Sequence, residues 1–363
     1  MGRMNDSHNK VLVAMSGGVD SSVAALLLRD AGYNAMGITL KLFHNEDAGI
    51  PSDKACCTLE DAEDARQVCL ELGLDHIVFN FTRTFGADVI DRFCDGYLRG
   101  ETPNPCIDCN RYVKFAALQQ RRRDLGYDYV ATGHYARRVF NGKTGRFELH
   151  RGLDENKDQS YVLFHLTQDT LAHMLFPLGD LSKPQVRQLA EENGFINAAK
   201  AESQDICFVP DGDYASFIAR TRGETFEPGE IVNRSGDVLG RHTGLIHYTA
   251  GQRKGIGVAA REPLYVFGKD MENNRLIVDT DANTLVESIE ARDVNFIALP
   301  RIDAPLHLTV KTHYRQRPIG ATVTQVADDR IRIAFDEPQR SCAPGQAAVV
   351  YDGNNVICGG TIE

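Results

Sequence analysis

The chain has 363 residues, a formal net charge of −10 at pH 7 and nine cysteines. This length exceeds that at which one hydrophobic core stops growing, so we expect two or three domains, and the acidic balance argues against nonspecific coating of nucleic acid. No apolar run reaches the roughly 20 residues of a membrane span, and residues 1–10 lack the apolar stretch of a signal peptide. We therefore expect a cytoplasmic protein with no membrane partner, whose cysteines are reduced thiols, metal or cluster ligands, or catalytic groups.

The first informative segment is Ser-Gly-Gly-Val-Asp-Ser-Ser, residues 16–22, between an apolar strand at 11–15 and an apolar helix expected from near Ser22 to Gly32. Its glycines let the backbone approach phosphate oxygens, the helix start offers N–H donors, and the serine hydroxyls can add more. The segment lacks the lysine of the Walker A pattern and the G-x-G-x-x-G spacing. Asp20 is interpreted as a magnesium partner or an orienter of the loop. The segment predicts an ATP site; the alternative is an ordinary strand, glycine turn and helix.

An alternation of strands and helices follows this segment. We expect strands at 34–40, 77–79 and 129–132 and a helix at 58–72. Such alternation predicts a Rossmann-like α/β domain with a parallel sheet and ligands at the carboxyl ends of the strands. Gly133-His134 would lie at that edge, where the glycine allows a nucleotide to approach and the histidine either binds or only satisfies local hydrogen bonds.

A mainly helical insert is expected between the third and fourth strands. It carries Thr-Pro-Asn-Pro-Cys-Ile-Asp-Cys-Asn-Arg, residues 102–111, which we expect in an exposed turn. Further on, Ser182 and Pro184 predict the start of a helix that ends near Gly194. The first domain is expected to span residues 1–215.

Helical periodicity then disappears. Short β-like runs with glycine turns predict a small β-rich central domain at 216–288. From Val294 onward, turn-rich segments separate further runs and predict a C-terminal β-barrel at 289–363. The expected barrel strands are 306–312, 321–326, 331–335 and 347–351.

The cysteines allow three interpretations. Cys106 and Cys109 form a C-x-x-C, and Cys207 lies in a later loop. A structural zinc site usually has four ligands, and no second C-x-x-C or paired histidine motif supplies the fourth. A thioredoxin-type dithiol requires a thioredoxin-like unit, which this sequence lacks. Sulfur chemistry at Cys109 and Cys207 is the remaining interpretation. No role is assigned to Cys56, Cys57, Cys69, Cys94, Cys342 and Cys358.

Motifs along the whole chain carry a resemblance. They are residues 16–22, Thr-Pro-Asn-Pro with Cys109, Gly133-His134-Tyr135, Lys157-Asp158-Gln159-Ser160-Tyr161, Cys207, Gly251-Gln252-Arg253-Lys254-Gly255 and the barrel. In this order they resemble the tRNA 2-thiouridylases of the PP-loop ATP pyrophosphatase superfamily, whose loop signature is S-G-G-x-D-S. The resemblance runs nearly from end to end.

The resemblance implies a two-stage reaction on uridine 34, the wobble base of tRNA. ATP with Mg²⁺ at residues 16–22 would adenylate the C2 oxygen of the base and release pyrophosphate. A persulfide on Cys207, loaded by a sulfur-donor relay protein or a cysteine desulfurase, would then deliver sulfur to C2 while AMP leaves. Cys109 is implied to be the nucleophile that releases this sulfur and ends in a disulfide with Cys207, a role that suits a thiolate.

The resemblance also implies which residues form the site. Asp20, Cys109 and Cys207 are implied to be catalytic. Nucleotide contacts are implied for Ala14, Met15, Ser16, Gly17, Gly18, Val19, Asp20, Ser21, Leu40 and Gly133. Contacts with tRNA are implied for Asn104, Pro105, Cys106, His134, Lys157, Asp158, Gln159, Tyr314, Arg315 and Gln346. Other basic residues could contact phosphates while an extruded base enters the pocket, namely Arg111, Lys114, Arg121, Arg122, Arg123, Arg137, Arg138, Arg253 and Lys254.

One departure from the family pattern leaves two mechanisms of sulfur transfer possible. Some members carry Asp at the position of Cys106, so Cys106, Cys109 and Cys207 could instead hold a [4Fe-4S] cluster whose open iron takes sulfide. Two further alternatives are another PP-loop tRNA-modifying ligase and a nonenzymatic iron–sulfur or RNA-binding module in which nucleotide is only a regulatory ligand.

Overall fold

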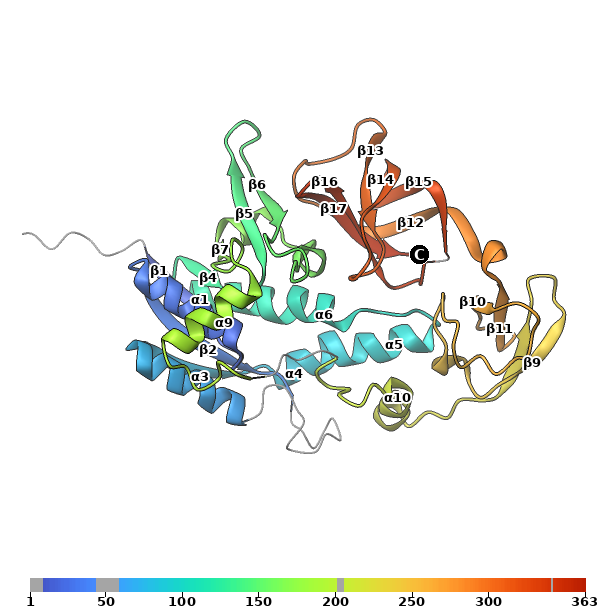
Figure 1. The fold of residues 1–363 in the computed structure, drawn as a ribbon, viewed down its shortest axis with the longest axis horizontal. Coiled ribbons are helices and arrows are strands. Elements are labelled where there is room, and N and C mark those ends of the chain that lie inside the picture. The colour runs from blue at the N-terminus through green and yellow to red at the C-terminus, as the bar shows by residue number, and fades with distance from the viewer. Residues whose placement is uncertain (1–8, 44–58, 201–205, 341) are drawn as a thin grey trace, which may run out of the picture. The chain divides into compact units, whose positions relative to one another are not determined.

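The computed structural model describes residues 9–43, 59–200, 206–340 and 342–363. The chain divides into two compact units (Figure 1). The first unit comprises residues 1–89, 106–212 and 354–356, and the second comprises 90–105, 213–353 and 357–363. Cys56 and Cys57 lie outside the described residues.

The first unit is built on a parallel sheet, as predicted. Its strands are β1 (Lys10–Ala14), β2 (Asn34–Lys41), β3 (Asp75–Asn80), β4 (Tyr129–Ala131) and β7 (Met174–Leu175), in the order β3-β2-β1-β4-β7. The change of direction on either side of β1 creates the point where open α/β sheets bind ligands. The residues that follow β1 and β4 therefore lie beside each other at the carboxyl edge.

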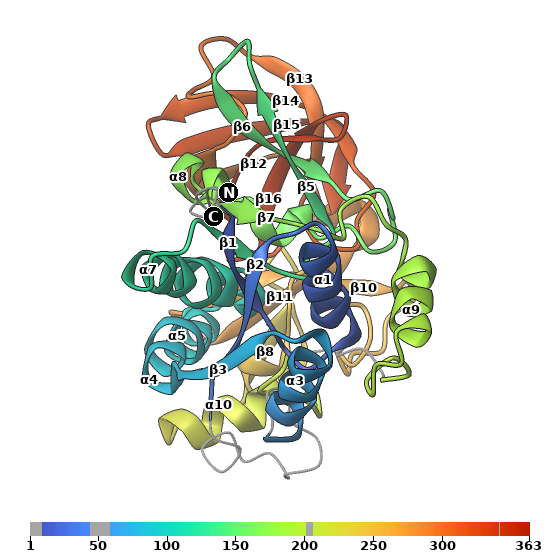
Figure 2. The same ribbon diagram turned by 90° about the vertical axis from the view of Figure 1, so that its left-hand side faces the viewer.

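Helices cover both faces of this sheet. The helices α1 (Val19–Asp30), α3 (Leu59–Leu72) and α9 (Lys183–Glu192) lie on one face, and α7 (Ala116–Asp124) lies on the other (Figure 2). Buried Val11, Val23, Val68 and Val186 belong to one core that joins β1 to the three helices of the first face. Because both faces are covered, the middle of β1, Val11, Leu12 and Val13, is apolar and fully buried.

Two helix starts test the sequence interpretation directly. The first helix begins at Val19, earlier than the expected start near Ser22, because the hydroxyls of Ser21 and Ser22 both donate to the Gly18 carbonyl and close the first turn there. The start of α9 is confirmed, since Ser182 and Gln185 form a capping box.

The insert between β3 and β4 is helical, as expected. It contains α4 (Thr82–Phe85), η1 (Gly86–Asp91), α5 (Arg92–Leu98), α6 (Pro105–Asp108), η2 (Cys109–Phe115) and α7. The expected exposed turn at 102–111 is wrong in its second half, where the chain is helical and Pro105 and Cys109 are buried. Burial of these apolar groups favours the helical turn over an open loop.

The sequence interpretation did not identify the elements between β4 and α9. They are β5 (Ala136–Asn141) and β6 (Arg146–Arg151), which form an antiparallel hairpin, followed by η3 (Ser160–Leu163) and α8 (Gln168–Ala172). Residues Asn355 and Val356 pair with β6 in the same compact unit.

The second unit contains a four-stranded sheet and a barrel. The sheet has the order β10-β11-β8-β9, formed by β8 (Gly229–Val232), β9 (Val238–His242), β10 (Leu264–Asp270) and β11 (Arg275–Thr280), and η4 (Leu245–His247) follows β9. The helix α10 (Tyr214–Arg222) precedes it, and η5 (Asp281–Thr284) follows it. This confirms the expected small β-rich region.

The C-terminal barrel is also confirmed. Its strands are β12 (Leu285–Phe296), β13 (Leu306–Lys311), β14 (Ile319–Ala327), β15 (Arg330–Arg340), β16 (Ala347–Asp352) and β17 (Asn355–Ile362). The antiparallel pairing of β12 with β17 closes it. Within the described part of the chain, we find no helix long and apolar enough to cross a membrane.

Candidate active site

The candidate site begins with the loop between β1 and α1, at the carboxyl end of β1. Gly17 has a φ of +71°, and a Cβ placed on it would lie 2.3 Å from the Asp61 carbonyl oxygen at the start of α3. Only glycine fits both constraints. Gly18 then caps α1 in an extended conformation, and no side chain among the described residues caps this helix start. The first N–H groups of α1 are therefore oriented for an anion.

The hydroxyl groups of Ser21 and Ser22 form hydrogen bonds to the backbone of the loop. Ser21 Oγ donates to the Gly18 carbonyl at 2.9 Å and accepts from the Ser16 N–H at 3.2 Å. Ser22 Oγ donates to the same carbonyl at 3.1 Å. A hydroxyl has one proton to donate, so Ser21 and Ser22 are not available as ligand donors in this arrangement, contrary to our expectation. Ser16 is exposed at the rim of the loop.

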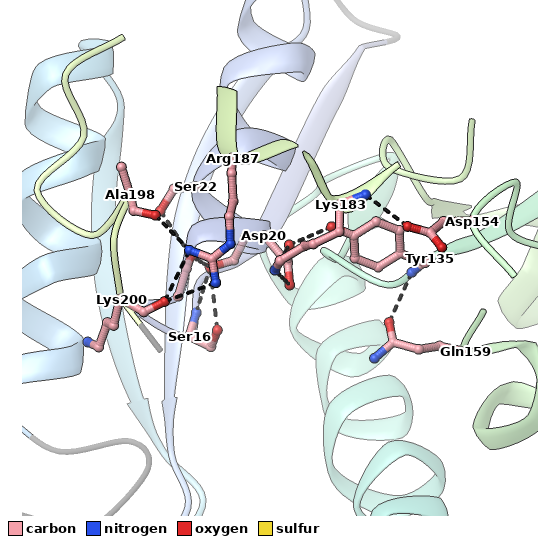
Figure 3. A network of polar contacts seen from close by, with 12 residues as sticks. Ser16, Asp20, Ser22, Tyr135, Asp154, Gln159, Lys183, Arg187, Ala198 and Lys200 are labelled. Carbon is pink, nitrogen blue, oxygen red and sulfur yellow. Dashed lines mark hydrogen bonds and ion pairs between the residues drawn. The ribbon is translucent and has the colours of Figure 1, made fainter. Parts of the chain in front are cut away.

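Asp20 points to a lysine from a distant part of the chain (Figure 3). Lys183 Nζ lies 2.7 Å from one carboxylate oxygen of Asp20 and 2.9 Å from the other. The Tyr135 hydroxyl donates to the same carboxylate at 2.7 Å. The loop that lacks a lysine of its own therefore has one supplied by the start of α9.

Lys183 was not among the predicted site residues, although the sequence contains one signal for it. Lys183 is the first residue of α9, where the positive end of the helix dipole disfavours a cation. Its side chain is also almost fully buried, with 9% of its surface exposed. A lysine at the first position of the predicted helix is therefore the sequence signal that could have marked Lys183 as a candidate.

A second set of contacts, from residues that follow α9, holds the loop in place. Asn197 Nδ2 donates to the Gly17 carbonyl at 3.0 Å and to Ser22 Oγ at 2.9 Å. Lys200 Nζ lies 2.6 Å from both the Asp61 and the Asp64 carboxylates. Although burial opposes it, hydrogen bonding to these two aspartates raises the pKa of Lys200. The loop is thereby tied to α3 and to the segment after α9.

The structure places two further predicted nucleotide-binding residues beside the loop. A Cβ on Gly133, which follows β4, would lie 2.8 Å from the Asp20 carbonyl carbon and 2.9 Å from the Ser21 nitrogen. The glycine thus permits close packing against α1. Leu40 is buried in β2, and the Thr39 hydroxyl donates to the Met15 carbonyl at 2.9 Å.

His134 is held as a neutral ring. Its Nδ1 lies 2.8 Å from the Thr132 hydroxyl, and its ring lies 5.8 Å from that of Phe115. Burial, with the charge of Lys114 and the proximity of His165 adding to it, lowers the pKa of His134 to about 3. At neutral pH this histidine can donate or accept a hydrogen bond but carries no charge.

The turn at residues 157–159 is joined to the loop through Tyr135. Gln159 Oε1 accepts from the Tyr135 N–H at 3.0 Å, and the Gln159 N–H donates to the Tyr135 carbonyl at 2.9 Å. Asp158 is buried and accepts from Arg151, from the Gly152 N–H, and from the N–H and hydroxyl of Ser160. Asp158 therefore holds the turn in shape and is a poor candidate for contacting a ligand.

The predicted catalytic cysteines have different surroundings. Cys109 is 7% exposed, and burial raises the pKa of its thiol to about 11, with the charge of Lys114 opposing. Cys106 is exposed. Cys207 is half-buried next to Phe208, whose ring packs 5.8 Å from that of Phe85. Cys109 and Cys207 both belong to the first compact unit.

A metal cluster does not fit this arrangement. Across the residues the structure describes, His, Cys, Asp and Glu side chains form no group of three or more with metal-binding geometry. Cys106, Cys109 and Cys207 are thus not assembled as ligands, and the iron–sulfur alternative has no support here.

Two of the basic residues predicted to contact tRNA form hydrogen bonds within the protein instead. Arg122 is buried and donates to the side chain of Gln119 and the carbonyl of Tyr127. Arg138 donates to the carbonyls of Leu171 and Ala172. These two side chains stabilise the first unit and are poor candidates for contacting RNA.

Other predicted tRNA contacts lie in the second unit. Tyr314 and Arg315 are exposed between β13 and β14, and Lys311 Nζ lies 5.7 Å from the centre of the Tyr314 ring. Asn104 is half-buried, and Gln346 contacts the backbone of Thr102.

Three family models match the chain in order. They are described as a tRNA methyl transferase HUP domain at residues 9–211, a tRNA methyl transferase PRC-barrel domain at 215–280 and an aminomethyltransferase β-barrel domain at 286–362. Our boundaries at 215 and 288 stay predictions.

Curated relatives match over nearly the whole chain. Proteins named tRNA-specific 2-thiouridylase MnmA are 43% identical in Clostridioides difficile (98% of this chain and 98% of the relative) and 48% identical in Moorella thermoacetica (97% and 99%). The relative of that name in Carboxydothermus hydrogenoformans is 45% identical over 98% of this chain and 97% of its own length. Since these matches run from end to end, the chain belongs to the tRNA-specific 2-thiouridylase MnmA family.

Proposed function

We propose that this protein is an ATP-dependent transferase that replaces the C2 oxygen of uridine 34 in tRNA with sulfur. One observation carries the proposal: a helix start without a side-chain cap among the described residues, beside the buried Lys183, shares a compact unit with Cys109 and Cys207. Relatives named for 2-thiouridine formation, identical at 43–48% of positions, support the same conclusion.

The loop is the proposed activation half of the site. The N–H groups that begin α1 would bind the phosphates of ATP, and Lys183 would add the positive charge that the loop itself lacks. Asp20 is the loop carboxylate suited to the Mg²⁺ that accompanies ATP, since Mg²⁺ is usually held by one or two carboxylates and the phosphates. Attack by the base oxygen on the α-phosphate would release pyrophosphate and leave AMP on O2.

The cysteines are the proposed sulfur half. The terminal sulfur of a Cys207 persulfide would attack C2, forming a C–S bond as the C–O bond to AMP breaks. The Cys109 thiolate would then attack Cys207 Sγ, so that the S–S bond breaks, 2-thiouridine leaves and a Cys109–Cys207 disulfide forms. A two-electron thiol reductant must reduce this disulfide before the next turnover. The donor of the persulfide sulfur would be a relay protein or a cysteine desulfurase.

The family-model descriptions speak of methyl transfer, whereas the relatives are named thiouridylases. We favour thiolation because methyl transfer needs no anion-binding loop with a lysine and no pair of thiols. The iron–sulfur version is set aside, because the three cysteines do not group as ligands in the described structure.

The test combines the protein with ATP, Mg²⁺, a persulfide donor and a tRNA transcript. Pyrophosphate release that requires tRNA, together with 2-thiouridine at position 34 by mass spectrometry, is the expected result. Cys207→Ala should release pyrophosphate and make no 2-thiouridine. A methylated base, or thiolation without ATP, would contradict the proposal.

A further inference from the structure

The segment that contains the residues predicted to contact the base is held by hydrogen bonds to a turn of the barrel. We call residues 99–105 the connector. It follows α5, belongs to the second unit and contains Asn104 and Pro105, two of the residues predicted to contact tRNA. The connector has no helix or strand before Pro105, so contacts outside regular structure must define its path.

A barrel turn binds both backbone polar groups of one connector residue. The Thr102 N–H donates to the Pro344 carbonyl at 2.7 Å. Gln346 Nε2 donates to the Thr102 carbonyl at 2.6 Å. A side-chain amide therefore completes a pair of hydrogen bonds like those between neighbouring strands.

Gly345 allows the turn to come this close. Its φ is +86°, and a Cβ placed on it would lie 2.9 Å from Glu101 Cβ and 3.1 Å from the Thr102 nitrogen. The turn is itself fixed to the end of β17, because the Gly345 N–H donates to the Ile362 carbonyl at 2.9 Å and the Ile362 N–H donates to Gln346 at 2.8 Å. The connector is thus attached to a turn that is itself hydrogen-bonded to a barrel strand.

Contacts on either side of Thr102 keep the connector in register. The Glu101 N–H donates to the Gly96 carbonyl at 3.0 Å, and a Cβ on Gly96 would lie 2.9 Å from Pro103 Cγ. The Glu101 carboxylate pairs with Arg99 at 3.0 Å and with Arg292 of β12 at 3.4 Å. The connector therefore folds back on the end of α5 and is covered by barrel residues.

We propose that Gly345 and Gln346 are positioning residues: they fix the connector at Thr102 and so set where Asn104 and Pro105 meet the target base. This inference rests on the proposed function. It gives Gln346 a role distinct from the direct tRNA contact implied by the family resemblance, because its amide acts through the Thr102 backbone. The barrel would then contribute to the chemical step as well as to tRNA binding.

Two variants remove the same contact by different chemistry. Gln346→Ala deletes the donor to the Thr102 carbonyl. Gly345→Ala retains Gln346 but places a methyl group against Glu101 and Thr102. The matched control is Gln339→Ala, since Gln339 is a barrel glutamine whose Nε2 donates only locally, to the Glu337 carbonyl.

Hydrogen exchange at the Thr102 amide, measured without tRNA, reports on the connector itself. Exchange should become about 10-fold faster or more in both variants and stay unchanged in the control. In thiolation assays kcat should fall by about 10- to 100-fold, since a misplacement of about 1 Å has that effect, while the tRNA Kd changes by less than about threefold.

The opposite pattern would overturn the proposal: weaker tRNA binding by Gln346→Ala, with normal Thr102 exchange in both variants, would make Gln346 a tRNA contact only. If Gly345→Ala does not fold, Gln346→Ala alone decides between these outcomes. Failure of the proposed function is separable, because the unaltered protein would then make no 2-thiouridine while its Thr102 amide stayed protected.

Discussion

Lys183 Nζ bridges both carboxylate oxygens of Asp20, at 2.7 Å and 2.9 Å, although the two residues are far apart in sequence. The pair joins the loop after β1 to the start of α9. Because the Tyr135 hydroxyl binds the same carboxylate, and Tyr135 also holds Gln159, one short set of contacts connects the predicted ATP loop with the predicted tRNA turn (Figure 3).

The first prediction concerns Lys183. Lys183→Met should lower the rate of tRNA-dependent pyrophosphate release by about 100-fold, since a cation oriented toward developing phosphate charge supplies a few kcal/mol. Lys183→Arg should retain part of the rate. The control is Lys143→Met, which alters an exposed lysine at the tip of the β5–β6 hairpin. Equal rates for Lys183→Met and the control would refute the role given to Lys183.

The second prediction concerns the geometry at Gly17. Gly17→Ala should abolish ATP binding, because its Cβ would collide with the Asp61 backbone and displace the loop. Gly32→Ala is the matched control, since Gly32 has a similar φ of +82° with nothing within 4 Å of the added Cβ. The control should lose only about 1 kcal/mol of stability and keep normal ATP affinity by calorimetry. Normal affinity in Gly17→Ala would show that the close approach is not required.

The third prediction concerns the reactivity of Cys109. Since burial raises the pKa of its thiol to about 11, alkylation by iodoacetamide should be slow at pH 8 and should accelerate as the pH rises toward that value. Lys114 stabilises the thiolate, so Lys114→Met should slow alkylation of Cys109 by about two- to tenfold. Peptide mass spectrometry gives the rates, with Lys143→Met as the control. A faster reaction in Lys114→Met would contradict this assignment of charge.

The fourth prediction concerns stability at mildly acidic pH. Burial, with the charge of Arg111 adding to it, lowers the pKa of His165 from its ordinary value of 6.5 to about 3. Below pH 6.5 the unfolded chain binds a proton that the folded chain does not, so stability is full above 6.5 and falls as the pH decreases toward 3. Between pH 6.5 and 5.5, His165 should lower the free energy of unfolding by about 1 kcal/mol.

The measurement is urea unfolding at those two pH values. His165→Gln should show the smaller loss of stability, whereas His247→Gln, at an exposed position, should behave like the unaltered protein. An identical pH dependence in His165→Gln would mean that the ring is accessible to protons in the folded state.

Local patterns predicted much of the fold because they depend on neighbours in sequence. Apolar runs located the strands of both units, and the Ser182 and Pro184 signals located the start of α9. The hairpin of β5 and β6 was missed, since its burial is mixed and its outer residues, including Phe140, are exposed. An apolar residue on an exposed face gives no alternation for a sequence pattern to detect.

The site was predicted less completely, for a related reason. The Ser-Gly-Gly loop is a continuous motif, so its glycines could be assigned roles from spacing alone. Lys183 and Thr102 gain theirs from partners brought close only by folding, Asp20 in one case and the Pro344–Gln346 turn in the other. Burial and helix-end chemistry point to such residues, but they do not name the partner.

The attachment of Thr102 to Gln346 also bears on how the protein matures. The two residues are separated by 244 positions, so at a synthesis rate of about 5–20 residues per second the connector waits roughly 12–50 s for its partner to leave the ribosome. The residues that hold the predicted ATP loop, which extend to Lys200, are synthesised in the first part of that interval. A chain truncated before residue 344 would therefore contain the predicted ATP loop but a connector without its barrel contacts, so we expect nucleotide binding to precede tRNA modification during synthesis.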